Sequence, residues 1–419
     1  MAILRLAWKS LLNRRFNAGL ILLSIALSVS LLVGVERLRH EAQTSFANTL
    51  SGTDLIVGAR GGSMQLLLYA VFRLGQASHN ISWSSYQAIA AHPRVAWTVP
   101  LSLGDSHRGY PVLGTDLGYF EHYRFARDRR LVFSQGGPFA DLYDAVLGAE
   151  VAAALGYRLG DSIVVGHGTG KVSLTAHADK PFRVVGILER TGTPVDRTVH
   201  VRLEAIEAIH LDWHAGAPVP GHSTSAEEAR HLDLTPRRIT AALVGVTSRA
   251  AAFRVQRFVN TYTEEPLSAI LPGVALSELW GLVGVAENAL RIISACVVLI
   301  GMLGMLTVLL TSLAERRREM AILRSVGARP WQLFALIMGE AGFLTLLGLV
   351  LGLGLLYIVL GVAQPLIQAE YGLSLSGRLP SFAEWRLLGA VAVAGFAVGA
   401  IPAYRAYRLS LVDGLSMRT

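Results

Sequence analysis

Two long apolar segments lie close together in the second half of the chain, separated by a short charged segment. Residues 292–314 carry no charged side chain, and residues 332–362 carry only Glu340. Each is long enough to cross the hydrocarbon core of a bilayer, which takes about 20 apolar residues in a helix. The sequence therefore predicts two transmembrane helices joined by a segment, residues 315–330, that lies at the membrane surface.

The joining segment has the pattern of a short amphipathic helix. Gly327 followed by Pro330 is typical of a helix end, and we expect Gly327 to adopt a left-handed backbone conformation. A helix at this place can be held by a protein in the cytoplasm. Its apolar residues are Met320, Ile322, Leu323 and Val326, and its charged residues include Arg317, Arg318, Glu319 and Arg324.

Two further apolar segments complete a predicted set of four spans. Residues 18–35 form the first span and residues 387–401 the last. Residues 1–17 place apolar side chains on one helical face, which predicts an amphipathic helix at the membrane surface. A cleaved signal peptide is the competing interpretation, but the apolar run is long and no small-x-small cleavage site follows it. We favour a retained anchor.

The positions of the basic residues predict the orientation in the membrane. They lie before the first span, between the second and third, and after the fourth, which is the pattern of cytoplasmic segments. Both termini, including residues 402–419, are then cytoplasmic, whereas residues 36–289 and the short loop 363–385 lie outside. These flanking positions account for the net charge of +8, so we infer no nucleic-acid partner. The flanking residues include Arg5, Lys9, Arg14, Arg15, Arg316, Arg317, Arg318, Arg405 and Arg408.

The large outer segment mixes strand-like and helix-like stretches. We therefore predict a membrane protein with four transmembrane α-helices and a large extracytoplasmic α+β domain inserted between helices 1 and 2. Residues 36–50 and 276–290 continue the adjacent spans with helix-forming residues, so we expect a helical stalk. The predicted strands are 54–57, 96–103, 110–113, 162–165, 172–175, 182–188, 200–203 and 239–246, and the predicted helices are 83–91, 140–155 and 250–262.

The charged segment also carries a family resemblance. Its sequence from Glu315, ERRREMAILRSVGA, followed by a span with Glu340 near its start, closely resembles the signature of FtsX-like and MacB-type ABC transporter permeases, the type VII or mechanotransmission superfamily. For the charged run alone, a generic basic loop is the alternative. The resemblance implies a coupling helix that docks on an ATPase subunit, with Ile322, Leu323 and Val326 as its apolar patch. The implied coupling residues are Glu319, Ile322, Leu323, Arg324, Val326, Gly327 and Ala328.

A second resemblance covers part of the outer segment. Residues 147–162, 182–188 and 191–196 look like the periplasmic core domain of MacB-type permeases. The resemblance implies that a smaller subdomain, at about residues 121–199, is inserted into a larger one.

The resemblance implies the function of a permease subunit rather than an enzyme. Such a subunit couples ATP hydrolysis by a separate ATPase subunit to a conformational change in its periplasmic domain, for export or extraction of a lipoprotein, peptide, antibiotic or similar substrate. The alternatives are a non-transport signalling subunit that activates a periplasmic cell-wall hydrolase and a membrane-bound enzyme. The implied setting is the bacterial inner membrane, with a second copy or paralogue, the lipid bilayer, and a periplasmic adaptor or substrate protein as partners. The substrate and the choice between homodimer and heterodimer stay open.

The sequence itself does not predict nucleotide binding. The glycine-rich segment 166–171 lacks the first glycine of a phosphate loop and the Ser or Thr after Lys171, so a hairpin between two strands is the better interpretation. No other Walker motif is present in the 419 residues. We expect no cofactor and no ATPase activity of the chain alone.

The remaining candidates concern packing, buried charge and metal binding. Glycines spaced i, i+4 allow close approach of helices, either inside one subunit or at a dimer contact. Glu340 is expected near the cytoplasmic interface, and pairing with an arginine of the coupling region is the favoured interpretation. His210 and His214 have a spacing that suits zinc if the segment is helical, but exposed histidines near a helix end are favoured, and we assign no metal. The spaced glycines are Gly348, Gly352, Gly395 and Gly399.

Overall fold

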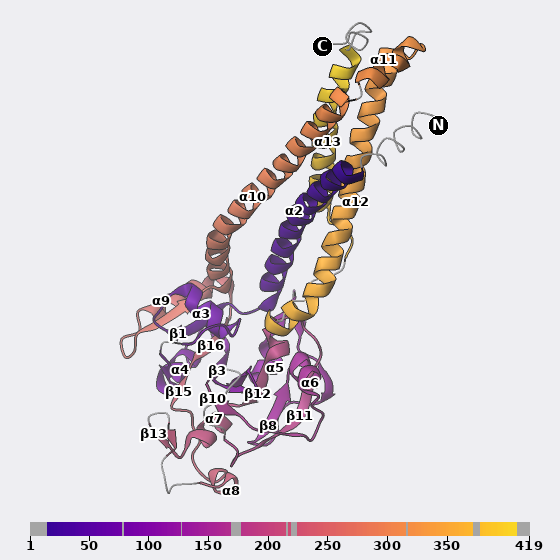
Figure 1. The fold of residues 1–419 in the computed structure, drawn as a ribbon. Helices are drawn as coiled ribbons and strands as arrows, with labels where there is room; N and C mark the ends of the chain where they lie inside the picture. Colours follow the sequence, from indigo (N-terminus) through magenta and orange to yellow (C-terminus); the bar gives the residue numbers. More distant parts are fainter. Residues whose placement is uncertain are drawn as a thin grey trace. The chain divides into compact units, whose positions relative to one another are not determined.

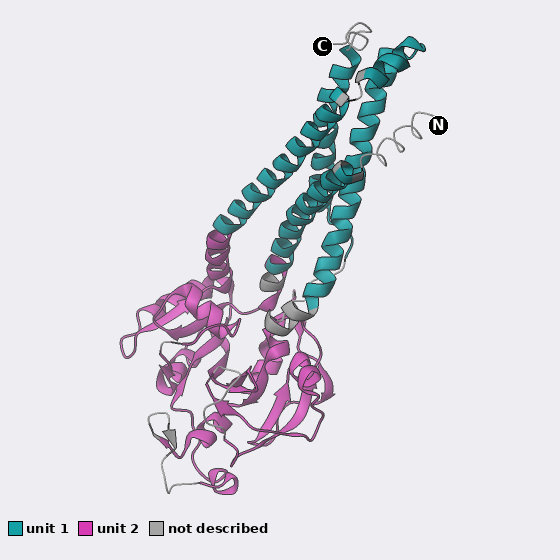
Figure 2. Cartoon of the chain, viewed as in Figure 1, with its two compact units in different colours: residues 1–42, 284–369, 375–419 teal, residues 43–283, 370–374 magenta. Residues whose placement is uncertain are grey.

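The chain forms two compact units in the computed structural model (Figure 2). Unit 1 comprises residues 1–42, 284–369 and 375–419, and unit 2 comprises residues 43–283 and 370–374. The predicted amphipathic helix at residues 1–17 lies outside the described residues apart from its last three positions. The described residues are 15–77, 79–126, 128–168, 177–214, 217–218, 224–315, 317–371 and 378–408.

Long helices build unit 1 (Figure 1). Four of them are long and apolar enough to cross a membrane, and each contains one of the predicted spans. They extend beyond those spans, because α2 continues to Thr49 and α10 begins at Pro272. The helices are α2 (Arg15–Thr49), α10 (Pro272–Glu315), α11 (Arg317–Ser325), α12 (Pro330–Tyr371) and α13 (Phe382–Arg408).

The helices of unit 1 share one apolar cluster and leave many apolar side chains exposed. Val29 of α2, Met305 of α10 and Leu344 of α12 are almost completely buried in that cluster. In contrast, Val350 and Val393 are two-thirds or more exposed. Apolar side chains on the outside of long apolar helices are what a lipid environment accommodates.

Unit 2 is built on an eleven-stranded mixed sheet within the described residues, which confirms the predicted α+β class. The strand order along the main path is β17-β1-β16-β3-β4-β12-β8-β11-β7, with β10 paired to β3 and β9 to β11. The pairs β8–β11 and β4–β12 are parallel, and the other pairs are antiparallel. The strands are β1 (Leu55–Ala59), β3 (Val95–His107), β4 (Tyr110–Thr115), β7 (Phe133–Gly136), β8 (Asp144–Leu147), β9 (Ser162–Ile163), β10 (Gly166–His167), β11 (Phe182–Leu188), β12 (Val199–Arg202), β16 (Ala241–Val246) and β17 (Leu267–Ile270).

Short helices and small strand pairs surround this sheet. Three separate apolar clusters form the core of unit 2. Strands from residues 121–199, the predicted smaller subdomain, belong to the same sheet as the strands on either side of them. The helices are α3 (Ser63–Ala70), α4 (Trp83–Ala90), α5 (Gly118–His122), α6 (Ala149–Leu155), η1 (Pro194–Arg197), α7 (Leu203–His210), α8 (Ala226–Ala229) and α9 (Arg249–Asn260), and the small pairs are β2 (Ile81–Ser82) with β15 (Arg238–Ile239), β5 (Arg124–Phe125) with β6 (Arg129–Arg130), and β13 (Trp213–His214) with β14 (Ala217–Pro218).

One predicted helix is wrong in its first half. Residues 140–155 contain the strand β8 before the helix α6 begins. All four residues of β8 are buried, and the strand lies between β11 and β12. A strand covered on both faces lacks the alternation that distinguishes a strand from a helix in sequence. Gly148 separates the two elements, and a Cβ there would lie only 2.2 Å from the carbonyl oxygen of Val195.

Several predicted strands have different ends in the structure, and two of them show a physical reason. The strand expected at residues 200–203 ends at Arg202, because Leu203 begins α7. The strand expected at residues 239–246 divides into β15 and β16 at Thr240, whose hydroxyl accepts a hydrogen bond from the Leu103 amide. The strand expected at residues 172–175 lies outside the described residues.

Candidate functional site in the helical unit

The short helix α11 has a defined end. Gly327 has a φ of +102°, as predicted, and this left-handed conformation favours glycine. The Ala328 amide donates to the Leu323 carbonyl at 3.0 Å, and the Gly327 amide donates to the Arg324 carbonyl at 3.1 Å. This pair of hydrogen bonds is the Schellman motif, which satisfies carbonyls at the end of a helix. The chain then enters α12 with Pro330 as its first residue.

Helix α11 presents two different faces. Met320 and Ala321 are buried, and Met320 packs with the half-buried Leu323 against apolar residues of α12 and α13. On the outer face, Ile322 is 51% exposed and Val326 is 83% exposed. Two of the three residues predicted for the apolar patch therefore point outward, one helical turn apart, while Leu323 contributes to the inner packing. The inner packing partners are Leu313, Leu333, Phe334, Leu336, Ile337, Met338, Ala403 and Ala406.

The charged residues predicted for coupling have mixed exposure. Glu319 is exposed, whereas Arg324 is half-buried, as is Ala328 just after the helix. Glu340, almost three turns into α12, is only 6% exposed. Its pairing with an arginine of the coupling region stays a prediction.

The four spaced glycines of unit 1 all lie against helices of the same chain. A Cβ at Gly348 would lie 2.6 Å from the Ile25 side chain, and one at Gly352 would lie 2.8 Å from the Ala26 carbonyl oxygen, so α12 approaches α2 closely. On α13, Cβ atoms at Gly395 and Gly399 would meet Thr345 and Ala341 of α12 at 2.5 and 2.4 Å. Packing inside one subunit therefore occupies these positions.

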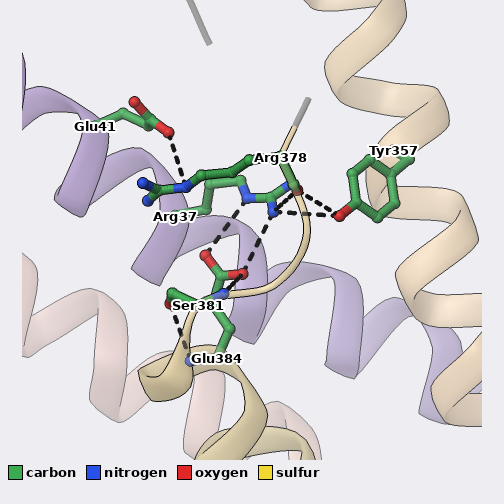
Figure 3. Close-up of polar contacts among 6 residues, drawn as sticks. All are labelled: Arg37, Glu41, Tyr357, Arg378, Ser381 and Glu384. Carbon is green, nitrogen blue, oxygen red and sulfur yellow. Dashed lines mark hydrogen bonds and ion pairs between the residues drawn. The ribbon is translucent and has the colours of Figure 1, made fainter. Parts of the chain in front are cut away.

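A buried ion pair links α2 to the start of α13 (Figure 3). Arg37 and Glu384 have exposed fractions of 0% and 1%. The Arg37 guanidinium donates to both carboxylate oxygens of Glu384 at 3.4 Å and to the Arg378 carbonyl at 2.6 Å. It also lies over the ring of Tyr357, whose hydroxyl donates to the same carbonyl at 2.7 Å. Three separate segments of unit 1, namely α2, α12 and residues 378–384, therefore meet at one guanidinium.

Neighbouring groups hold this cluster in place. Ser381 and Glu384 form a capping box, in which each backbone amide donates to the other residue's side chain. The Arg378 side chain pairs with Glu41 of α2 at 3.4 Å, as Figure 3 shows. Local sequence patterns did not predict this cluster. The available signals were Arg37 two positions after the apolar run ending at Val35 and the Ser-x-x-Glu pattern that opens the fourth membrane-spanning helix.

A second charged group joins α2 to α10. Arg39 pairs with Glu36 at 2.6 Å and lies 3.9 Å from Glu287, while Arg291 donates to Glu36 at 3.1 Å. These residues are partly exposed, so removing one of them should cost less than removing one partner of the buried pair.

The histidine pair and the glycine-rich segment of unit 2 differ from their sequence patterns. Helix α7 ends at His210 and His214 lies in strand β13, so the helical arrangement considered for zinc does not exist. His210 lies instead near Asp105 and His167. Gly166 and His167, expected in the turn of a hairpin, form the strand β10 paired with β3. Residues 169–176 lie outside the described part, so the hairpin between the strands expected at residues 162–165 and 172–175 stays a prediction.

The chain has four candidate spans, a capped amphipathic helix between the second and third, and an α+β unit between the first and second. Together these features define a multi-pass membrane protein of the transporter-permease class. Residues 18–257 match the family described as MacB-like periplasmic core domain, and residues 291–411 match the FtsX-like permease C-terminal family. The chain belongs to this family of ABC transporter permeases.

The relatives of this chain include an ABC transporter permease and export ATP-binding/permease proteins. An uncharacterized ABC transporter permease, MJ1507 of Methanocaldococcus jannaschii, is 24% identical over 233 residues, which are 54% of this chain and 51% of that protein. The pyoverdine export ATP-binding/permease protein PvdT of Pseudomonas fluorescens is 22% identical over 98% of this chain and 58% of its own length. The chain thus spans little more than half of each of these two relatives.

A further relative and a solved structure match parts of the chain. The macrolide export ATP-binding/permease protein MacB of Nitrobacter winogradskyi is 35% identical over 127 residues, 30% of this chain and 19% of that protein. The crystal structure of the periplasmic region of MacB from Actinobacillus actinomycetemcomitans is 12% identical and covers 55% of this chain and 94% of that chain, with a TM-score of 0.33.

Proposed function

We propose that this chain is the permease subunit of an ABC transporter whose ATPase is a separate subunit that docks on α11. The exposed apolar pair Ile322 and Val326 carries the proposal. These residues stand on a helix whose inner face is packed and whose end is capped, so the docking surface is preformed. Apolar side chains in this setting supply the buried anchors that dominate protein interfaces.

Close packing explains how motion of an ATPase is passed into the membrane helices. Met320 and Leu323 pack α11 against α12 and α13, and the glycine contacts hold α12 against α2 and α13. A displacement of α11 therefore moves several helices together. Because α2 and α10 are each continuous from unit 1 into unit 2, we propose that they carry the change to the outer domain.

The remaining parts of the function follow the same proposal. The outer domain lies in the periplasm, the helices cross the bacterial inner membrane, and two permease copies or paralogues work as a pair. The outcome is export or extraction of a substrate such as a lipoprotein, peptide or antibiotic, helped by a periplasmic adaptor. The names of the relatives, which include macrolide and pyoverdine export, support an export role.

The docking surface is tested by charge substitution on the outer face of α11. The wild-type chain is purified from its native membranes, and mass spectrometry identifies the ABC ATPase that accompanies it. Ile322→Asp and Val326→Asp should each weaken that association by about 1–4 kcal/mol, because each places a carboxylate in an apolar contact. The measurement is the amount of ATPase retained and its ATP turnover.

A matched control separates docking from general damage. Phe253→Asp changes an apolar residue of α9 that is 65% exposed, and it should leave the ATPase bound. Two results contradict the proposal: the wild-type chain carries no ATPase, or both α11 variants retain it as well as the control does.

A further inference from the structure

Three elements of unit 2 bring Asp105, His167 and His210 together. Strand β10 pairs with β3 so that His167 stands opposite Asp105, and α7 packs against β3 with His210 as its last residue. Strand β3 is irregular between Leu103 and Ser106, and this stretch contains Asp105. Residues separated by more than 40 positions in the sequence therefore share one place on the fold.

The distances in this group suit a metal ion. The Nδ1 atom of His167 lies 3.1 Å from Oδ1 of Asp105, and Nε2 of His210 lies 3.7 Å from the same oxygen. One ligand atom from each residue can be chosen so that all three lie within 4.8 Å of one another. Ligand atoms about 2.0–2.2 Å from a tetrahedral zinc ion are about 3.3–3.6 Å apart, so a small adjustment completes the geometry.

The hydrogen bond of His210 fixes which nitrogen is available. Nδ1 lies 2.7 Å from the Ile206 carbonyl oxygen. A carbonyl only accepts, so Nδ1 carries the proton and Nε2 keeps its lone pair. That Nε2 is buried and has no hydrogen-bond partner among the described residues. An imidazole held by a backbone carbonyl through one nitrogen, with the other nitrogen open, is the usual arrangement of a metal ligand.

His177 adds a second imidazole nitrogen without a partner. Its side chain is 2% exposed, and its Nε2 is buried with no hydrogen bond to any described residue. Its ring lies 5.0 Å from that of His210, centre to centre.

An ion-pair network around Asp105 does not explain why Nε2 of His177 and Nε2 of His210 have no hydrogen-bond partner among the described residues. The carboxylate of Asp105 accounts for the Nδ1 contact of His167, but Nε2 of His210 lies beyond hydrogen-bond distance from it. Nearby His107 shows the contrast, since Val164 and Tyr157 engage both of its ring nitrogens. His177 and His210 are therefore arranged differently from a satisfied core histidine.

We propose that Asp105, His167 and His210 bind one divalent transition-metal ion of the zinc class, with His177 beside them as a further nitrogen donor. Two imidazoles and a carboxylate match the preference of zinc, whereas calcium and magnesium prefer oxygen ligands alone. His167 is 47% exposed, which gives the ion a path from solvent. A bound ion joins α7 to the edge of the sheet formed by β3 and β10.

The test uses the full-length chain, purified in detergent with a tag that contains no histidine and stripped of metal. Cobalt(II) is titrated first because its visible spectrum reports the coordination, and zinc(II) then competes for the site. The expected result is one ion per chain in a four- or five-coordinate site. His167→Ala, His210→Ala and Asp105→Asn should each weaken binding more than about tenfold.

Two control variants test whether cobalt(II) binds at this site and not elsewhere. His231→Ala removes a histidine that is 79% exposed and should bind cobalt(II) as the wild type does. Trp213 lies 4.7 Å from the His177 ring and 5.6 Å from the His167 ring, so cobalt(II) should quench its emission, and Trp213→Phe should lack that quenching. Circular dichroism shows whether each variant is folded. If His210→Ala or Asp105→Asn unfolds, the comparison of His167→Ala with the wild type decides the test.

Two results overturn the proposal. One is a wild-type chain that takes up neither cobalt(II) nor zinc(II) at micromolar concentration. The other is binding by folded His167→Ala that is as tight as wild-type binding.

Discussion

The Arg37–Glu384 pair of unit 1 and His200 of unit 2 show two different ways of burying polar groups. Unit 1 buries a full ion pair, Arg37 with Glu384, and surrounds it with further hydrogen bonds. Unit 2 buries the imidazole of His200, which has an exposed fraction of 0% and is surrounded by Tyr119 and Phe120. Burial lowers the pKa of His200 to about 3, so it is held in its neutral form.

The difference shows what specifies each unit. Water drives the apolar side chains of unit 2 into its three cores, but lipid accepts apolar side chains as readily as another helix does. The helices of unit 1 therefore depend more on close backbone approach and on paired charges to fix their arrangement. Three substitutions test this comparison.

The largest effect should come from breaking the buried ion pair. Arg37→Met leaves the Glu384 carboxylate buried without its partner, which should cost about 3–5 kcal/mol. The double variant Arg37→Met/Glu384→Gln removes both charges and should recover most of that loss. Hydrogen exchange at the amides of residues 381–390, measured on the full chain in detergent, reports the local opening. Equal exchange in Arg37→Met and in the wild type would show that the pair does not hold this end of α13.

A smaller effect should come from closing the space between α2 and α12. Gly352→Ala places a Cβ 2.8 Å from the Ala26 carbonyl, and such overpacking should cost about 1–3 kcal/mol. Gly354→Ala is the matched control, since a Cβ there meets nothing within 4 Å and alanine favours a helix. Thermal loss of helical circular dichroism in detergent should occur earlier for Gly352→Ala alone. If both variants melt together, close approach at Gly352 is not a source of stability.

The smallest effect concerns the neutral imidazole of unit 2. The folded pKa of His200 is about 3 and its ordinary value is 6.5, so its contribution to stability is complete above pH 6.5 and is lost as the pH falls toward 3. The loss should reach at most about 2 kcal/mol at pH 5. Urea unfolding of the strand signal at pH 7 and pH 5 measures it. His200→Phe should reduce the pH dependence, and an unchanged dependence would assign it to other groups.

Local sequence patterns predicted the elements that depend on local chemistry. The strand at residues 182–188 was predicted with its correct ends, and Gly327 was expected to end α11 because only a left-handed residue closes that turn. The orientation of Leu323 was not predicted, because the sequence shows that α11 is amphipathic but not which neighbours cover its apolar side. The inner face became evident only from its contacts with α12 and α13.

Contacts between distant residues were beyond the sequence analysis. Arg37 and Glu384 are 347 positions apart, and no periodic pattern connects them. The same holds for Asp105 and His167, which a strand pairing brings together. The spacing of His210 and His214 suggested a helical pair, but the helix ends at His210 and the neighbours of that residue come from elsewhere in the chain.

The two faces of α11 also bear on how a permease and its ATPase diverge together. Substitutions at Met320 disturb packing with two other helices, so the fold itself limits the residues accepted there. Ile322 and Val326 have much more exposed side chains and are less constrained by that packing. With the docking on α11 that we propose, changes at these two positions are a route by which a duplicated permease acquires a new ATPase partner while its membrane helices keep the same arrangement.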